Sequence, residues 1–142
     1  MAAIYDGLEF KTPLEAQWAA FFDLAGWKWN VNPRPVGNWS PDFRVTFPCG
    51  HSECRGSHTL LASVLPLSRI EDFKGHPALS FPYGGLQGKH ISADASAAFG
   101  ASPRVTTWEM THGSGGGVED VPNWVGNADA LWTKAATLVS QL

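Results

Sequence analysis

The chain is organised around residues 12–26, which read TPLEAQWAAFFDLAG. Thr12 suits a helix N-cap, Pro13 suits the first helical position, and Glu15 completes the pattern of a capping box. Gly26 is a natural C-terminal stop. Apolar side chains recur at helical spacing between these signals, at Leu14, Trp18, Phe21, Phe22 and Ala25. The pattern predicts an amphipathic helix that begins at residue 13 and ends at about residue 25.

Three strands are predicted after this helix. Residues 27–32 alternate large apolar and polar side chains, and the prolines that follow end the strand. In residues 42–47 the alternation places Phe43, Val45 and Phe47 on one face and Asp42, Arg44 and Thr46 on the other. Residues 59–67, TLLASVLPL, are almost uninterrupted apolar sequence, which predicts a strand buried on both faces.

The second half of the chain has weaker signals. Residues 68–71 repeat the helix-start pattern and predict a short helical turn through Lys74. Residues 84–102 are rich in Gly, Ala and Ser and predict no defined element. Residues 105–110 predict a strand, and residues 112–117 predict a flexible loop. A C-terminal helix is predicted over about 127–142, with an apolar face of Leu131, Trp132, Ala135, Leu138, Val139 and Leu142.

This order of elements predicts an α/β fold in one domain, residues 1–142, with a mixed central sheet flanked by helices. Hydrophobic residues make up 44% and charged residues 16% of the chain, which excludes disordered and coiled-coil classes. The net charge of -3 and pI of about 5.9 lack the basic field of many nucleic-acid binders, so such contact needs a local patch. The N-terminal sequence has no signal-peptide pattern and no apolar run reaches membrane-spanning length, so we expect a soluble, intracellular protein without membrane contact.

Four features together resemble small phage and bacterial nuclease-like proteins of the PD-(D/E)XK superfamily. They are LEAQW at 14–18, the Trp-rich hairpin, SPDF at 40–43 and the long apolar strand, and the resemblance covers roughly residues 8–75. It implies a restriction-endonuclease-like fold, a Mg²⁺- or Mn²⁺-dependent endonuclease acting on DNA or RNA, and, for a phage-encoded protein, the host cytoplasm. In such enzymes a helix glutamate, the aspartate of the P-D pair and an acid-x-lysine pair converge on the metal. Glu15 and Asp42 match the first two.

The acid-x-lysine pair is degenerate in this chain. Carboxylates suit Mg²⁺ because it is a hard ion with oxygen ligands, and the lysine supports the attacking water. Ser63 stands at the acid position and Leu65 at the lysine position. The resemblance therefore implies a catalytically impaired phosphodiesterase site. Two functions stay open: a nuclease-fold protein that acts on or binds nucleic acid, or a non-enzymatic binding protein or inhibitor of a host nuclease or defence complex.

Each candidate residue also has a simpler interpretation. Asp72-Phe73-Lys74 is itself an acid-x-lysine triplet that would restore the site, yet Asp72 and Lys74 also suit a solvated helix face. Glu15 is where a capping box places a glutamate, whether or not it binds metal. Asp42 follows a proline at a strand entrance, where aspartate commonly accepts hydrogen bonds from turn amides.

The loop at 48–58 carries a second constellation, formed by Cys49, His51, Cys54 and His58. Two thiolates and two imidazoles are a typical ligand set for structural zinc, although four ligands from one loop would strain a tetrahedron. The alternative is a reduced loop in which both cysteines pack as small apolar groups. If this loop were the centre of the protein, a third function would be a small zinc-stabilised interaction domain.

Overall fold

The computed structural model describes residues 1–83 and 92–141. In chain order its elements are β1 (Ala3–Tyr5), β2 (Leu8–Phe10), α1 (Pro13–Ala25), β3 (Lys28–Val31), β4 (Phe43–Pro48), β5 (Ser57–Val64), the 3₁₀ helices η1 (Ile70–Phe73) and η2 (Pro77–Leu79), β6 (Ala95–Phe99), β7 (Thr106–His112), β8 (Gly115–Glu119), α2 (Val121–Trp124), α3 (Ala128–Thr137) and β9 (Ser140–Gln141).

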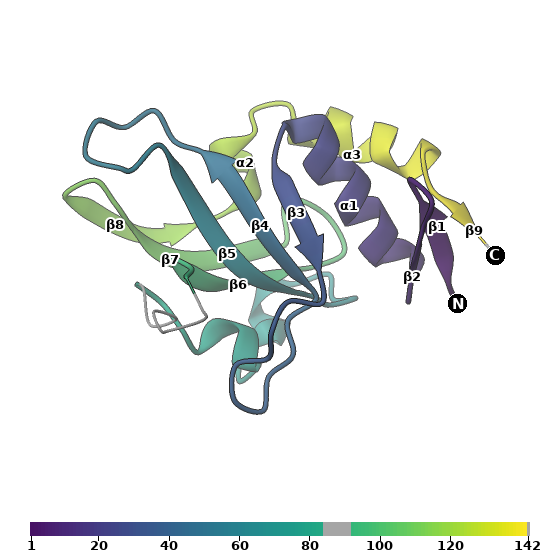
Figure 1. The fold of residues 1–142 in the computed structure, drawn as a ribbon, viewed down its shortest axis with the longest axis horizontal. Coiled ribbons are helices and arrows are strands. Elements are labelled where there is room, and N and C mark those ends of the chain that lie inside the picture. The colour runs from purple at the N-terminus through teal and green to yellow at the C-terminus, as the bar shows by residue number, and fades with distance from the viewer. Residues whose placement is uncertain (84–91, 142) are drawn as a thin grey trace.

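The main sheet has six strands in the order β3-β4-β5-β6-β7-β8 (Figure 1). All neighbouring strands are antiparallel except β5 and β6, which are parallel, so the sheet is mixed, as the sequence predicts. The connection between these two parallel strands contains η1 and η2. Among the described residues, no helix has the length and apolar character needed to cross a bilayer.

Helix α1 begins and ends where its sequence signals place it. The Thr12 hydroxyl accepts a hydrogen bond from the Glu15 amide at 3.2 Å, and Gly26 takes a left-handed φ of 78° at the C-cap. The predicted alternation in β4 is also confirmed, because Phe43, Val45 and Phe47 are buried while Arg44 and Thr46 are half-buried.

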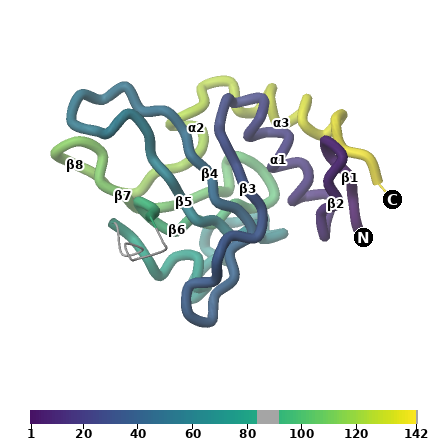
Figure 2. The backbone as a smooth tube through the Cα atoms, viewed as in Figure 1, coloured from purple at the N-terminus to yellow at the C-terminus, as the bar shows by residue number. Residues whose placement is uncertain are grey.

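A small second sheet joins the two ends of the chain. Its order is β2-β1-β9, and Figure 2 shows both termini on the same side of the molecule. The β1–β2 hairpin turns at Asp6 and Gly7, which have φ values of 50° and 76°. Asp-Gly is a common turn dipeptide in two-residue hairpins, so the local sequence contains a signal for this hairpin, which was not predicted.

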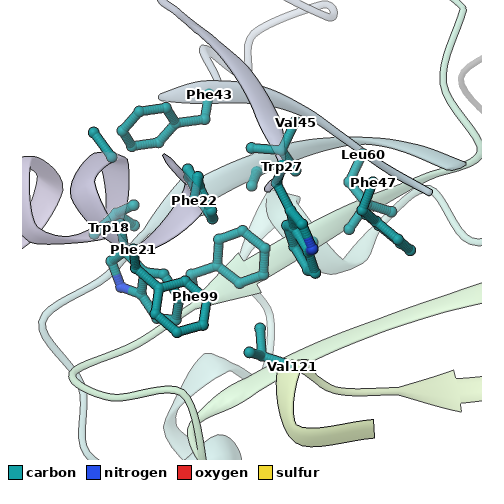
Figure 3. Close-up of a cluster of buried hydrophobic side chains, with 14 of the residues drawn as sticks. Trp18, Phe21, Phe22, Trp27, Phe43, Val45, Phe47, Leu60, Phe99 and Val121 are labelled. Carbon is teal, nitrogen blue, oxygen red and sulfur yellow. The ribbon is translucent and has the colours of Figure 1, made fainter. Parts of the chain in front are cut away.

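The larger core lies between α1, α3 and one face of the main sheet (Figure 3). Trp18 of α1 is fully buried and stacks on Phe99 of β6, with ring centroids 4.9 Å apart. Its indole nitrogen donates a 2.9 Å hydrogen bond to the Gly100 carbonyl. This single side chain therefore joins the first helix to the central strand β6 by both packing and hydrogen bonding.

A smaller core covers the opposite face of the sheet. It is formed by Trp39, Leu61, Phe73, Ala78, Ala93 and Ala98, with Leu65 packed against it. Phe73 comes from η1 and Ala78 from η2, so two short 3₁₀ helices take the place of a covering helix on this face. The predicted helical turn at 68–74 is present as η1, but its N-cap is Arg69 rather than Ser68.

The observed strands differ from the predicted ones in three places. Strand β5 is buried on both faces as predicted, but it ends at Val64 because Pro66 cannot donate to the sheet. Strand β6, ASAAF, was not predicted because small residues carry little strand preference, although all five are buried. The predicted flexible loop at 112–117 contains the start of β8, whose Gly115–Gly117 segment pairs with β7.

The C-terminal helix is shorter than predicted. Helix α3 ends at Thr137, and Ser140 and Gln141 form β9 instead of a last helical turn. Leu138, placed on the apolar face by periodicity, is 43% exposed, and Leu142 lies outside the described residues. The strand pairing of β9 with β1 explains the early end, because extended backbone is needed for it.

Candidate functional site

Glu15 and Asp42, the two carboxylates singled out by the resemblance, lie close together. Glu15 is on the first turn of α1 and Asp42 directly precedes β4. The Lys11 ammonium lies 3.1 Å from Asp42 Oδ1 and 3.9 Å from Glu15 Oε1. The three side chains border a small cavity of about 110 Å³. The carboxylate of Glu15 therefore points toward Asp42 and Lys11, while only its amide takes part in capping α1.

Burial and charge act on this group of side chains together. The Glu15 and Asp42 side chains are only 12% and 15% exposed, whereas Lys11 is 68% exposed. Burial, and then the negative charge of Asp42, raise the pKa of the Glu15 carboxyl. The hydrogen bond to Asp42 raises the pKa of Lys11, so the ammonium is stabilised beside the carboxylates. Lys11 thus supplies positive charge to the acidic pair from within the chain.

Asp42 also has a structural role. Its second oxygen, Oδ2, accepts a 2.8 Å hydrogen bond from the Val64 amide at the end of β5. Its own amide donates to the Ala62 carbonyl at 2.8 Å. Asp42 therefore joins the entrance of β4 to the last residues of β5, and the amide it accepts from belongs to this neighbouring strand and not to the local turn that its position after Pro41 suggested.

Ser63 and Leu65 both make structural contacts within the protein. The antiparallel register of β4 and β5 ends at Phe43 and Ala62, and neither Ser63 nor Leu65 is among the described residues that border the Glu15–Asp42 cavity. Ser63 is 4% exposed, and its hydroxyl accepts a 2.8 Å hydrogen bond from Trp39 Nε1. Leu65 packs against the smaller core. At the positions expected to hold the acid and the lysine, the chain has a satisfied hydroxyl and an apolar side chain.

The alternative triplet lies in a different place. Asp72 and Lys74 are exposed on or beside η1, and the Phe73 between them is fully buried in the smaller core. Neither Asp72 nor Lys74 is among the described residues that border the Glu15–Asp42 cavity. The structure therefore favours the simpler interpretation, in which Phe73 anchors η1 and its two charged neighbours face solvent.

Four metal-binding side chains converge at the opposite end of the sheet. They are Cys49 after β4, Cys54 in the β4–β5 loop, His58 on β5 and His112 at the end of β7, and their ligand atoms all lie within 4.8 Å of one another. His112 Nδ1 lies 3.7 Å from Cys49 Sγ and 3.9 Å from Cys54 Sγ. Both cysteines are free thiols. This donor set can hold a metal ion.

The predicted ligand set thus differs by one histidine from the observed cluster. Cys49, Cys54 and His58 are brought together, but the fourth member is His112 instead of His51. His51 Nδ1 already accepts a 3.1 Å hydrogen bond from the Glu53 amide, and the His51 ring packs beside His112 at 4.9 Å between centroids. The sequence contained no local signal for His112, because it joins the loop only through the fold of the β7–β8 hairpin.

His58 is the most constrained member of the cluster. It is 5% exposed, and neither of its ring nitrogens has a hydrogen-bond partner. Asp94 Oδ2 lies 3.6 Å from His58 Nδ1, which is beyond hydrogen-bond distance, and itself accepts from the Thr59 amide at 2.7 Å. Burial lowers the pKa of His58 and so favours its neutral form, which is the form that binds metals.

Comparisons with protein-family models, with curated proteins and with solved structures return no match for this chain.

Proposed function

We propose that the chain is a nuclease-fold protein of the PD-(D/E)XK type that does not hydrolyse phosphodiesters and acts by binding another macromolecule. The observation that supports this most strongly is at Ser63, which the resemblance puts at the acid position and whose buried hydroxyl accepts a hydrogen bond from Trp39. A hydroxyl that accepts a hydrogen bond from Trp39 and carries no charge is a poor ligand for Mg²⁺. Leu65 cannot orient a water molecule for attack.

The state of the two remaining carboxylates also supports a binding role. Lys11 contacts Asp42 and lies within 4 Å of Glu15. A divalent cation approaching this pair would have to displace the ammonium, and it would find two carboxylates where the motif supplies three acidic groups. Binding of Mg²⁺ or Mn²⁺ at this position is therefore expected to be weak.

The distribution of positive charge favours a protein partner over nucleic acid. Binding to a phosphate backbone draws its affinity from free arginine and lysine side chains. Three of the five arginines have acceptors within the chain: Arg44 donates to the Ser92 carbonyl, Arg69 pairs with Glu71, and Arg104 pairs with Asp129 at 2.7 Å. With a net charge of -3, the chain is better suited to a partner recognised by shape and polar contacts.

We propose in addition that the Cys/His cluster holds zinc. Two thiolates and two imidazoles are the ligands that Zn²⁺ prefers, whereas Mg²⁺ and Mn²⁺ prefer oxygen. A bound Zn²⁺ would keep both thiols deprotonated and give His58 the partner that its buried ring lacks. Its role in the proposed protein is structural.

Restoring the missing groups tests the proposed relationship to nucleases. The double replacement Ser63→Glu with Leu65→Lys is compared with Ser63→Gln with Leu65→Met, which has similar volumes but no charges. We expect the charged pair alone to cleave plasmid or single-stranded DNA with Mn²⁺, and circular dichroism to show that both variants fold. Folded variants that are equally inactive would contradict the placement of Ser63 and Leu65 at the motif positions.

A further inference from the structure

We infer that zinc in this protein is a clamp between two hairpins, with His112 as its fourth ligand, and that it joins β5 to β7 beyond the pairing of β6 with β7. This inference extends the proposed zinc site, since it names the ligand set and the role of the ion. It depends on three observations: the position of the cluster in the sheet, its interatomic distances and the unpartnered nitrogens of His58.

The cluster lies beyond the first paired residues of β6 and β7. Strand β6 begins at Ala95, which pairs with Leu60 of β5, and on its other side Ala97 pairs with Trp108 of β7. His58 lies two residues before Leu60, and His112 lies four residues after Trp108, so both extend beyond the first residue of β6. At this end Asp94, which precedes β6, still donates a 2.7 Å hydrogen bond to the Thr59 carbonyl of β5, whereas the pairing of β6 with β7 begins only at Ala97 and Trp108. Figure 1 shows the β4–β5 loop and the β7–β8 hairpin projecting together at this end.

The distances suit one tetrahedral ion. Zn–S bonds of about 2.3 Å and Zn–N bonds of about 2.0–2.1 Å give a sulfur-to-nitrogen edge of about 3.6 Å in a tetrahedron. The two edges from His112 Nδ1 to Cys49 Sγ and Cys54 Sγ are 3.7 and 3.9 Å. Since all four ligand atoms lie within 4.8 Å of one another, small side-chain movements are enough to bring them around one ion.

The ring of His58 provides an independent indication of a ligand. A buried polar nitrogen without a hydrogen bond is rare in folded proteins, and here both nitrogens of one ring lack a partner. Asp94 lies nearer Nδ1, at 3.6 Å, which leaves Nε2 as the nitrogen for the metal. A carboxylate on the other nitrogen of a ligating histidine is a common second contact that orients the ring. Asp94 is thus a positioning residue for His58.

With four protein ligands, the proposed zinc ion would have no open coordination position for a substrate. Structural zinc sites have four protein ligands, whereas catalytic sites leave a position for water. Cys49 and His58 are buried, and Trp124 packs against both His58 and His112, with ring centroids 5.6 and 5.2 Å apart. A zinc ion held by these four ligands would therefore fix the β4–β5 loop against the β7–β8 hairpin.

The two neighbouring histidines provide a matched test. In the full chain, His112→Ala removes a proposed ligand, and His51→Ala removes an imidazole that lies beside the cluster but outside it. Native mass spectrometry and titration with Co²⁺ report stoichiometry, affinity and coordination. We expect one metal per chain for the unchanged protein and for His51→Ala, and an affinity at least about 10-fold weaker for His112→Ala. Retention by His112→Ala with loss by His51→Ala would overturn the clamp.

A second variant guards against misfolding of His112→Ala. His112→Cys should keep the metal and add a third thiolate, which strengthens the sulfur-to-cobalt charge-transfer absorption, whereas His51→Cys should leave that absorption unchanged. An unchanged spectrum for His112→Cys would contradict the inference. If the unchanged chain binds no Zn²⁺ or Co²⁺, or if mass spectrometry finds two hydrogens lost to a Cys49–Cys54 disulfide in the freshly purified protein, the proposed zinc site itself is wrong.

The mechanical role has its own readout. Removing the metal with a chelator should speed amide hydrogen exchange in residues 48–58 and 109–119, because the tie between them is lost. Exchange in α1, which packs in the larger core away from the cluster, should change little. Equal acceleration throughout the chain, or none in the two hairpins, would contradict the clamp even where zinc binds.

Discussion

The indole nitrogen of Trp39 donates a 2.8 Å hydrogen bond to the hydroxyl of Ser63, on the face of the sheet that the smaller core covers. Both side chains are almost fully buried, at 6% and 4% exposure. Ser63 therefore contributes to the smaller core, because its hydroxyl accepts the hydrogen bond of an indole N–H that would otherwise be buried without a partner.

This pair predicts a measurable coupling. Ser63→Ala leaves the Trp39 N–H buried and unpaired, and Trp39→Phe removes the donor together with part of the core. We expect each single change to cost about 1–3 kcal/mol of unfolding free energy. The double variant should be more stable than the sum of the singles implies, by about 1 kcal/mol in a urea-unfolding cycle. Strict additivity would show that the hydrogen bond contributes nothing.

Trp18 predicts the largest single loss of stability. Trp18→Phe removes the donor to the buried Gly100 carbonyl and leaves a void beside Phe99. The expected cost is about 2–4 kcal/mol, from an unsatisfied acceptor and lost packing. Trp29→Phe, at a half-buried indole that bonds an exposed Asp23 carboxylate, is the control and should cost less than about 1 kcal/mol. Comparable losses in urea unfolding would show that Trp18 is not the main link between α1 and β6.

Glu15 predicts a pH dependence of stability. Its folded-state pKa lies above the ordinary value of 4.5, so its contribution to stability is complete below that pH and is lost as the pH rises through the folded-state value. Glu15→Gln keeps the size of the side chain and removes this loss. We expect the variant to melt on the order of 2 °C higher than the unchanged chain at pH 7 and at about the same temperature at pH 4. The exposed Glu9→Gln controls for the change in net charge, and a Glu15→Gln variant that melts lower at pH 7 would contradict the prediction.

The charge distribution predicts weak contact with nucleic acid. Fluorescence anisotropy of labelled single-stranded and double-stranded oligonucleotides at low salt should show no saturable binding by the unchanged chain, because its net charge is -3 and three of its five arginines are engaged within the protein. Saturable binding that weakens steeply with added salt would instead assign the partner as nucleic acid and overturn the preference for a protein.

What could be predicted from sequence is what depends on local chemistry. Helix α1 has its cap, its apolar spacing and its stop within fifteen consecutive residues, so its bounds were predicted correctly. The alternation of β4 and the apolar run of β5 likewise report burial directly. Glu15 and Asp42 were predicted to meet only through the resemblance, because nothing in their local sequence shows that α1 lies beside the entrance of β4.

The features that were missed depend on tertiary contacts. Strand β6 consists of Ala, Ser and one Phe, and becomes a strand because it is buried between β5 and β7. The glycines of β8 have no strand preference, yet their backbone pairs with β7. His112 lies far from the Cys/His loop in sequence. Its place in the cluster, where His51 was predicted, therefore follows from the sheet alone.

The proposal that this chain does not hydrolyse phosphodiesters is tested most directly by a cleavage assay. The unchanged chain and Asp42→Ala are incubated with plasmid and single-stranded DNA and with RNA, each with Mg²⁺ or Mn²⁺. We expect any trace cleavage to be equal for the two proteins, because Asp42 is paired with Lys11 and neither Ser63 nor Leu65 carries a charge. Cleavage by the unchanged chain that Asp42→Ala abolishes would show a working metal site and contradict the account.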